Sequence, residues 1–449
     1  MSLKFKITTL LFFVMVMNLM AQQKWTLDEC ITYAIDHNLT LKDFELTEKS
    51  GAETYRQSIR NLLPGINASS DYTLRFGRQE DPNTGVFVNT DFFENNYGLF
   101  ASFDIFQGFQ KLNTIKASKF LRQAAKEDVE QQKFLLAFRV MTAFYNIKFF
   151  EGLVANAKEQ LKISQTNYEL VQRQIELGLM AGADLYEAES QLFADKLVVV
   201  QSENSLQAAH LVLIQEMNLK GATTINVQDT LGVSVFDTVA VDSLAEDNIY
   251  AKAKGFIPVI KAQELRTKAA KKNMAIAKGN LAPTLTLDAG FVTRYAETFQ
   301  DDNGQVISFD RQIEDNAAKF IGVSINIPIS QGWSRHSAVK QQKIAFERAK
   351  NDLEVQEQVL YQTIQQLVQE HNALVAEYEQ GKKRTESQNL AFEIAQKRYE
   401  KGLINALELF TAKNLFATAQ NDTLQARLRL EVNKSTLDFY RGLPVFAIN

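Results

Sequence analysis

The sequence predicts a mixed α and β fold in which long antiparallel helical hairpins continue into pairs of strands, with the whole pattern occurring twice. One observation is a repeated stretch. "QIELGLMAGADL" (174–185) and "RYEKGLINALEL" (398–409) share a Gly-Leu pair, followed by an acid and a leucine six and seven residues after the glycine. Another is two runs, 109–177 and 333–401, that contain one glycine each and no proline. Each run allows on the order of 100 Å of helix.

The repeated stretches are predicted to be hairpin tips, where a long helix reverses and a glycine provides backbone freedom at the helix end. Shorter helical segments, 41–63 and 179–219, would run back alongside the long helix of the first half. Since the strand pairs and the tips recur about half a chain apart, we predict a tandem duplication. Its repeats are 22–235 and 236–449, with a linker at 221–247.

The N-terminus has the layout of a secretory signal peptide. Lys4 and Lys6 precede an apolar run from Ile7 to Met20, which ends at Ala21 before polar residues. The run is too short for a membrane-spanning helix, which needs roughly 20 residues. We therefore expect a signal peptide at 1–21 and a mature protein outside the cytoplasm.

Composition argues against several function classes. Lysine and arginine total 49 against 53 acids, so the net charge of −4 argues against a nucleic-acid partner. No nucleophile motif, metal-ligand spacing or phosphate-binding loop is present, so we expect no enzyme activity, no cofactor and no metal site. The single cysteine, Cys30, cannot form an internal disulfide, and we expect it to be buried in a helix rather than lipidated.

Four strands are predicted from alternation of apolar and polar residues with period two. In the first, Ile66, Tyr72 and Leu74 alternate with residues such as Asn67 and Asp71. The strands lie at about 66–77, 96–106, 284–295 and 319–329, the length that a tilted strand needs to cross a membrane. Pro64 and Pro283 precede the first strand of each half and mark helix-to-strand transitions.

Alternation alone leaves two readings of these strands open. A soluble antiparallel sheet with one wet face alternates in the same way. The connections at 77–96 and 296–318 favour membrane strands, because they are long and acidic whereas soluble hairpins usually close in about two to five residues. Four strands cannot close a barrel, and open edges cannot face lipid, so the chains would pool their strands. Physical reasoning does not choose between two chains and three.

The tip motifs, the strand pairs, the duplication and the signal peptide together resemble the outer-membrane efflux protein family, the TolC-like channels of tripartite efflux and type I secretion systems. The resemblance implies a homotrimer in the outer membrane of a Gram-negative bacterium, in contact with outer-membrane lipid. Four strands from each protomer would form one transmembrane β-barrel, and the helices would extend into the periplasm. It implies a periplasmic adaptor (membrane fusion) protein and an inner-membrane transporter as partners, and a passive exit duct as the function.

The resemblance also implies a periplasmic gate. Tyr399 and Asp184 match a tyrosine and an aspartate that pair across the closed tip in the family, and Glu408 matches an acid that lines the constriction. Where some members carry an arginine two residues after the second tip glycine, this chain has Ile404. The acids also suit the first turn of a helix, where they complement the macrodipole, and the tyrosine could equally pack between helices.

The hairpin tips are where we expect the adaptor to dock. The residues concerned are Gly178 and Leu179 in the first tip and Gly402 and Leu403 in the second. A different class of protein, an exported soluble coiled-coil structural or adaptor protein, would also explain the long helices and the signal peptide. It would not require strands with aromatic ends placed between rising and falling helices.

Overall fold

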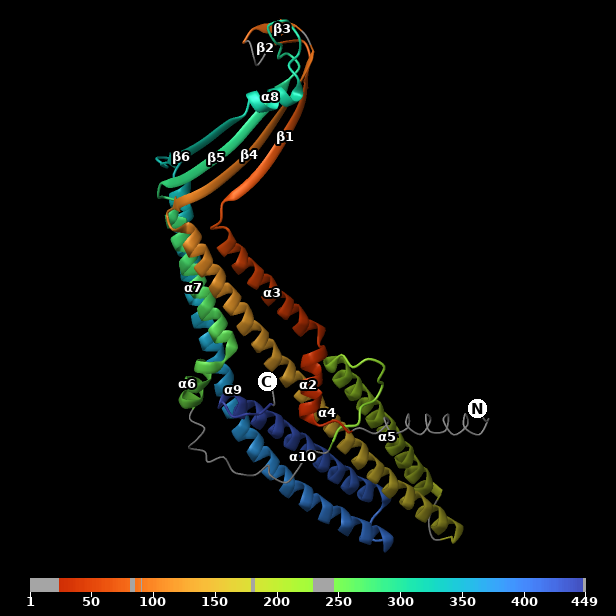
Figure 1. Ribbon diagram of the computed structural model, residues 1–449. Coiled ribbons are helices and arrows are strands. Elements are labelled where there is room, and N and C mark those ends of the chain that lie inside the picture. The colour runs from red at the N-terminus through yellow and green to blue at the C-terminus, as the bar shows by residue number, and fades with distance from the viewer. Residues whose placement is uncertain (1–23, 81–84, 90, 179–181, 229–245, 447–449) are drawn as a thin grey trace, which may run out of the picture. The chain divides into compact units, whose positions relative to one another are not determined.

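The computed structural model describes residues 24–80, 85–89, 91–178, 182–228 and 246–446 (Figure 1). The predicted signal peptide and Leu179 lie outside the described residues. The chain forms two compact units. The described residues within Met1–Leu46, Glu127–Lys261 and Val355–Asn449 make up the helical unit, and those within Thr47–Lys126 and Ala262–Glu354 make up the sheet unit. Each unit contains segments from both halves of the sequence.

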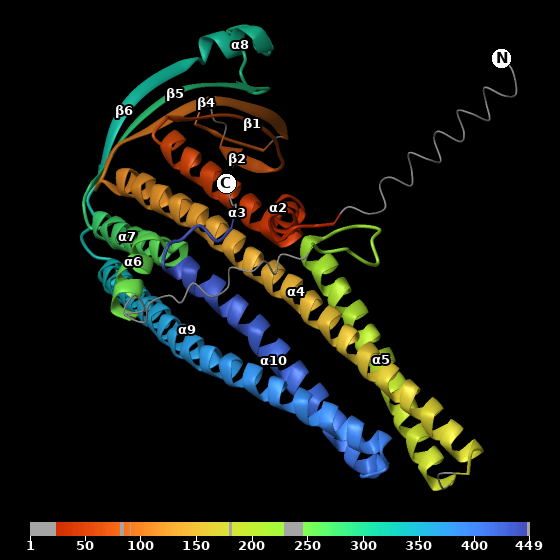
Figure 2. The same cartoon turned by 90° about the horizontal axis from the view of Figure 1, so that it is seen from below.

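The sheet unit contains one four-stranded antiparallel sheet in the order β1-β4-β5-β6 (Figures 1 and 2). The strands are β1 (Gly65–Arg75), β4 (Phe92–Gln107), β5 (Thr284–Ala296) and β6 (Ala318–Asn326). The second strand thus begins ahead of the predicted 96, and the fourth ends before 329. The central pair β4 and β5 joins the two halves of the chain, and β1 and β6 are the edges.

The register separates the two faces of the sheet. Ile66, Ala101, Ala289 and Ile321 pair in a row across all four strands. The adjacent row consists of Gly65, Ser102, Asp288 and Gly322. Because successive side chains point to opposite faces, one face is apolar and the other carries mainly small and polar residues.

Two phenylalanines on the polar face cover glycines. A Cβ atom at Gly98 would lie 2.4 Å from the ring of Phe100, and one at Gly290 would lie 2.4 Å from the ring of Phe320. The two ring centroids are 6.5 Å apart. These rings occupy the space that side chains at the two glycines would need, which explains glycine inside the strands.

One end of the apolar face carries a band of aromatic rings. Tyr72 and Phe93 have ring centroids 4.2 Å apart, and Tyr295 lies 5.6 Å from Phe93 on the other side. The band continues to Phe309, whose ring lies 5.3 Å from that of Tyr295. Phe309 begins a short helix, α8 (Phe309–Asp315), so this helix lies against the aromatic end of the sheet.

Both connections between strands contain structure that the sequence did not predict. The first includes a small hairpin of β2 (Arg78–Glu80) and β3 (Phe87–Asn89). The second includes α8, which is fastened by the buried side chain of Gln312. Its amide donates to the carbonyl oxygens of Ala296 (3.1 Å) and Ile307 (2.7 Å) and accepts from the Ala296 N–H (3.0 Å).

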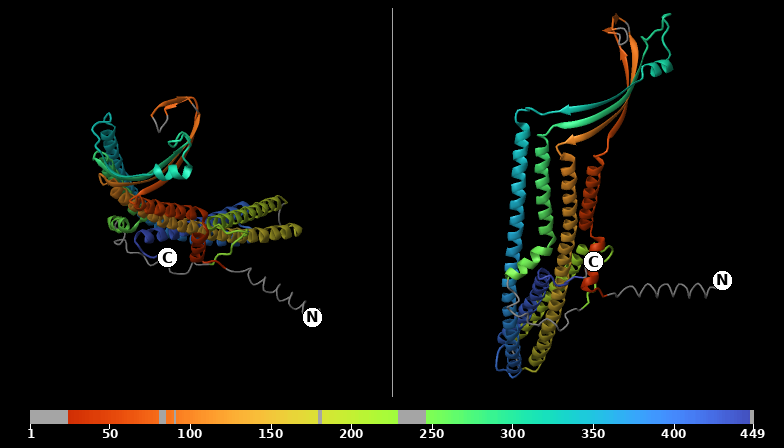
Figure 3. Two further views of the ribbon diagram at one scale, coloured as in Figure 1. Left: turned by 45° about the horizontal axis from the view of Figure 1, so that its top comes forward. Right: turned by 60° about the vertical axis from the view of Figure 1, so that its left-hand side comes forward.

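Each strand of the sheet continues into a helix. α3 (Leu39–Arg60) leads into β1, and α7 (Pro258–Gly279) leads into β5. β4 leads into α4 (Gln110–Glu176), and β6 leads into α9 (Ser334–Glu400). Figure 3 shows the helix ends in the same order as the strands. At each junction, the apolar residues therefore change from alternation with period two in the strand to a helical pattern in the helix.

The two strand-to-helix junctions use the same backbone device. Gly108 and Phe109 have φ angles of 58° and 61°, and Gly332 and Trp333 have 58° and 60°. At the first junction a Cβ on the glycine would lie 2.3 Å from the carbonyl oxygen of Gly279. Glycine is needed there for both its left-handed backbone and its small size.

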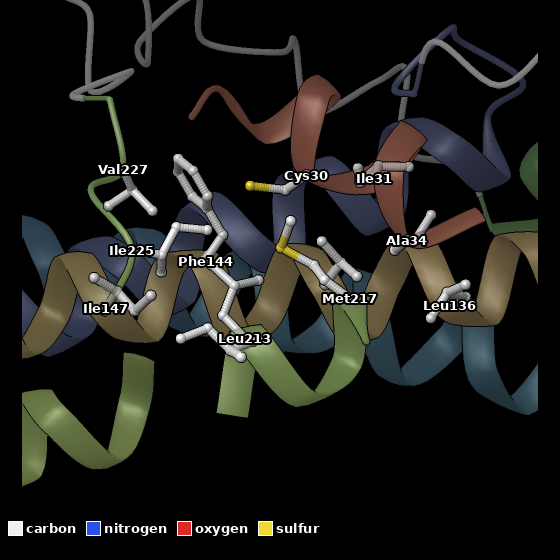
Figure 4. Packing of buried hydrophobic residues seen from close by; sticks show 14 of the residues in the cluster. Cys30, Ile31, Ala34, Leu136, Phe144, Ile147, Leu213, Met217, Ile225 and Val227 are labelled. Atoms are coloured by element: carbon white, nitrogen blue, oxygen red, sulfur yellow. The ribbon is translucent and has the colours of Figure 1, made fainter. Parts of the chain in front are cut away.

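The helical unit contains α2 (Leu27–His37), α5 (Gly182–Met217), α6 (Glu246–Phe256) and α10 (Ala406–Tyr440), with the adjoining parts of α4 and α9. Its main apolar cluster joins α2, α4, α5 and the segment after α5, with Cys30, Phe144, Met217 and Ile225 among its members (Figure 4). A capping box of Thr26 and Glu29 begins α2.

Among the described residues, no helix combines the length and the apolar character needed to cross a membrane.

Burial of Cys30, as the sequence predicted, gives a testable pH dependence. Burial, with a smaller effect of Glu29, raises the pKa of the Cys30 thiol from 9.0 to about 12. The unfolded thiol ionises first, so this stabilisation is complete below pH 9 and is lost as the pH rises towards 12. We expect the thermal stability of the wild-type protein to fall over that pH interval. The thermal stability of the Cys30→Ala variant should fall less. An equal decline in both proteins, or rapid maleimide labelling of the native thiol at pH 8, would contradict this.

Candidate functional site at the hairpin tips

The second hairpin reverses at a glycine C-cap. Gly402 has a φ of 70°, and its N–H donates to the carbonyl of Tyr399 at 2.8 Å. The N–H of Leu403 donates to the carbonyl of Arg398 at 2.9 Å. These two bonds form a Schellman motif, which satisfies carbonyls at the helix end and requires a left-handed residue. The next helix begins directly, because the Asn405 side chain accepts the Glu408 N–H at 2.9 Å.

The first hairpin ends α4 in the same way. Gly178 has a φ of 72°, and its N–H donates to the carbonyl of Ile175 at 2.9 Å. The described chain resumes at Gly182, which begins α5, and Asp184 lies in the first turn of that helix. Both predicted tips are thus helix ends with a left-handed glycine, and Leu179 lies outside the described residues.

Apolar side chains are exposed around both tips. Leu177 and Tyr186 are exposed beside the first tip, and Leu403 and Leu407 beside the second, with Leu403 64% exposed. Among the described residues, apart from each glycine's own chain neighbours, no atom lies within 4 Å of the position that a Cβ would take at Gly178 or Gly402. Two large apolar side chains are therefore exposed to solvent beside each tip.

Tyr399 lies inside the protein. Its side chain is 3% exposed and belongs to a tip cluster that includes Ala188 of the first hairpin and Phe392 and Leu409 of the second. Among the described residues its hydroxyl has no hydrogen-bond partner. Burial raises the pKa of the tyrosine, and the carboxylates of Asp184 and Glu187 raise it further. The fold therefore brings Tyr399 and Asp184 near each other from different hairpins, without a hydrogen bond from the tyrosine.

The other predicted gate residues lie at the surface of the protomer. Asp184 is half-buried, and Glu408 is exposed, with its backbone N–H donated to the Asn405 side chain in the cap of α10. The described residues include no group of three histidine, cysteine or acidic side chains placed to hold a metal ion.

The sequence analysis missed a buried polar cluster between the hairpins. Lys413 of α10 is 1% exposed and pairs with Asp195 of α5, and both contact Ser164 of α4. The spacing of residues along α10 could have indicated that this lysine is buried. Lys413 lies four residues after Leu409 and three before Phe416, so it falls on the buried face of α10.

The fold and the tips define a protein of the outer-membrane channel type, with helical hairpins attached to an open-edged sheet. The chain matches the family model "Outer membrane efflux protein" over residues 31–218 and 250–443, and it belongs to this family. It is therefore an outer-membrane channel of the efflux and export class. The family match favours this class over the exported soluble coiled-coil protein that the helices alone also allow.

Similar proteins agree with this membership. The outer membrane protein TolC of Vibrio cholerae is 24% identical over 398 residues, covering 86% of this chain and 85% of that protein. The probable outer membrane lipoprotein SilC of Salmonella typhimurium is 22% identical over 410 residues, covering 90% and 83%.

Solved structures share the fold. The CmeC outer membrane channel of Campylobacter jejuni superposes with a TM-score of 0.78 at 15% identity, covering 93% of this chain and 85% of that one. VceC of Vibrio cholerae superposes with a TM-score of 0.76 at 16% identity, covering 93% and 96%.

The left-handed glycine at the second tip leads to a prediction. Gly402→Ala should destabilise the protein by about 1–2 kcal/mol. There is room for the methyl group, but a φ of 70° is strained for a residue with a Cβ atom. Gly255→Ala is the control, since Gly255 lies within helix α6 with open space around it and no positive φ. That change should be neutral or stabilising by up to about 1 kcal/mol. Thermal unfolding in detergent measures both, and equal shifts would contradict the assignment of the C-cap.

Proposed function

We propose that the protein is a homotrimeric, passive exit duct that receives substrates from a periplasmic adaptor protein and an inner-membrane transporter. The main observation is the sheet, which has one apolar face and two edges without a neighbouring strand among the described residues. On β6 the apolar row is exposed in the protomer, and Ile321 is 75% exposed. Such a surface is suited to lipid rather than to water.

Pooling of strands would remove the open edges. If β6 of one protomer pairs with β1 of the next, the backbone groups of every strand are satisfied, as a membrane requires. Three chains would supply twelve strands in one barrel. The shared fold with the CmeC outer membrane channel supports a channel assembly of this chain.

The helices offer a second surface for neighbouring protomers. Phe193, Leu197 and Val200 are exposed on α5 at spacings of four and three residues, so they form one stripe along the helix. A stripe of this kind packs against another helix in coiled-coil fashion. We propose that it packs against a neighbouring protomer and continues the duct as a helical tunnel in the periplasm.

The tips would form the gate of this duct. Asp184, Tyr399 and Glu408 all lie within the tip region, and the two acids are accessible to solvent while the tyrosine anchors the hairpins together. Three copies of Glu408 around a threefold axis would repel one another and attract cations. Closure would then depend on tyrosine packing that outweighs the repulsion between the carboxylates.

The exposed tips would receive the adaptor. The residues proposed to contact it are Gly178, Leu179, Gly402 and Leu403, and the exposed leucines beside the described tip glycines support an apolar contact there. We further propose that residues 22–235 and 236–449 are structural repeats, each providing one strand pair and one tip. The family is one of transport channels, and we propose that the duct performs no chemistry of its own.

Removing gate carboxylates should open the duct. The Glu408→Ala variant, and the Tyr399→Phe variant combined with Asp184→Ala, should raise the conductance of the trimer in planar lipid bilayers severalfold. Alanine at 408 widens the constriction and removes the carboxylates that hold cations there, and the double variant weakens the tip contacts that keep the hairpins together. Glu386→Ala is the control, since Glu386 is an exposed acid on α9 away from the tip.

The outcomes separate the parts of this proposal. An unchanged conductance in both gate variants would remove these residues from the gate while leaving the duct. If the wild-type protein forms no channel at all, the duct itself is wrong.

A further inference from the structure

A buried ammonium group joins the two hairpins of one protomer above the tips. The Nζ atom of Lys413 donates to the Ser164 hydroxyl oxygen at 2.6 Å and forms an ion pair with Asp195. The Ser164 hydroxyl donates to the same carboxylate, and the other carboxylate oxygen accepts from Gln191 at 3.0 Å. One side chain of α10 is thereby held by α4 and α5 together.

This cluster ends a polar seam between α4 and α10. The α4 residues of the seam recur at every fourth position and so lie on one face of the helix. From the far end towards the tips, the contacts are Gly152 with Leu424, Asn156 with Asn421 (2.8 Å), Gln160 with Gln420 (3.5 Å) and Ser164 with Lys413 (2.6 Å). Three of these four contacts are hydrogen bonds between side chains, so polar contacts join the two hairpins along this line in addition to the apolar tip cluster.

Polar contacts of this kind specify the axial position of one helix against another. An apolar side chain can slide along a neighbouring helix and still be buried, but a buried charge needs its partner at one place. Burial lowers the pKa of Lys413, which shows that the surroundings disfavour the charge, and the Asp195 carboxylate opposes this effect. A shift of α10 by one turn would leave both charges buried and unpaired.

We propose that Lys413, Asp195 and Ser164 form a register lock, which fixes α10 against α4 and α5 in the closed duct and must break for the duct to open. This inference rests on the proposed function, and it adds positioning residues to the gate. Packed helices change state by discrete sliding, so a contact that tolerates one register acts as a two-state element. The lock lies on the hairpin-to-hairpin contact itself, whereas Glu408 lies on the exposed surface of the tip.

The test compares two variants that separate gating from stability. Lys413→Met leaves a buried, unpaired carboxylate, so it should lower the thermal stability of the trimer. Lys413→Met combined with Asp195→Asn removes both charges, and the new amide can still bond to Ser164 and Gln191, so most of the stability should return. We expect both variants to show a severalfold higher closed-state conductance than the wild-type trimer.

An exposed ion pair within the first hairpin, which contains Asp195 and Ser164, provides the control. Lys158 of α4 and Glu203 of α5 lie 2.7 Å apart, with side chains 58% and 45% exposed. Lys158→Met should change neither stability nor conductance appreciably, because exposed pairs contribute little. A purely structural role for Lys413 predicts that conductance follows stability, so the double variant would conduct like the wild type. That result would overturn the proposal.

A distance measurement tests the lock without relying on conductance. Spin labels at Lys196→Cys and Asn414→Cys would report the position of α5 against α10, since both residues are exposed and adjoin the lock. Cys30 is buried and should not react. Labelled protomers are diluted with unlabelled ones, so that each trimer carries at most one labelled pair. We expect one narrow distance distribution in the otherwise wild-type trimer and a broad or displaced one in the double variant. Identical distributions would overturn the lock, whereas a wild-type protein without channels would instead overturn the proposed duct.

Discussion

The unpaired edges of the four-stranded sheet are the constraint on which the rest of the structure depends. β1 and β6 each have a strand on one side only among the described residues, and one face of the sheet is mainly apolar. A backbone edge of this kind needs a partner, in lipid above all. The protomer is therefore read as one part of a closed assembly, and its helices, which continue directly from the strands, must follow the same symmetry.

The sequence predicted the main strands and helices because their periods are long and regular. Alternation located β1 and β5 closely, and the absence of proline located the two long helices. The prediction of element boundaries from the sequence failed where local chemistry or tertiary contacts decide where a strand or helix begins and ends. β4 begins at Phe92 because "FFENN" pairs with β1, although Asn95 interrupts the apolar alternation. β6 ends at Asn326, ahead of Pro328, which has no N–H for a ladder. α8 depends on Gln312 bonding to β5, which no local pattern predicts.

The candidate site was predictable only in part. Left-handed glycines at both tips follow from the repeated Gly-Leu motif, and the position of Tyr399 near Asp184 follows from the fold of the two hairpins. The sequence also allowed Tyr399 to pack between helices, and the structure buries its side chain in the tip cluster. Lys413 and Asp195 lie far apart in the chain, so their pairing required the packed helices, although each charge falls on an apolar helical face. Gating would then involve the buried contact between hairpins as well as the exposed tip.

The most direct test of this account is the detergent-corrected mass of the particle extracted from washed outer membranes. The account predicts three chains per particle, because three sets of four strands close the sheet edges in one barrel. A particle with another number of chains would contradict the twelve-strand assembly. A monomer recovered in the soluble fraction would contradict the central claim that the open edges of the sheet are closed by other copies of the chain.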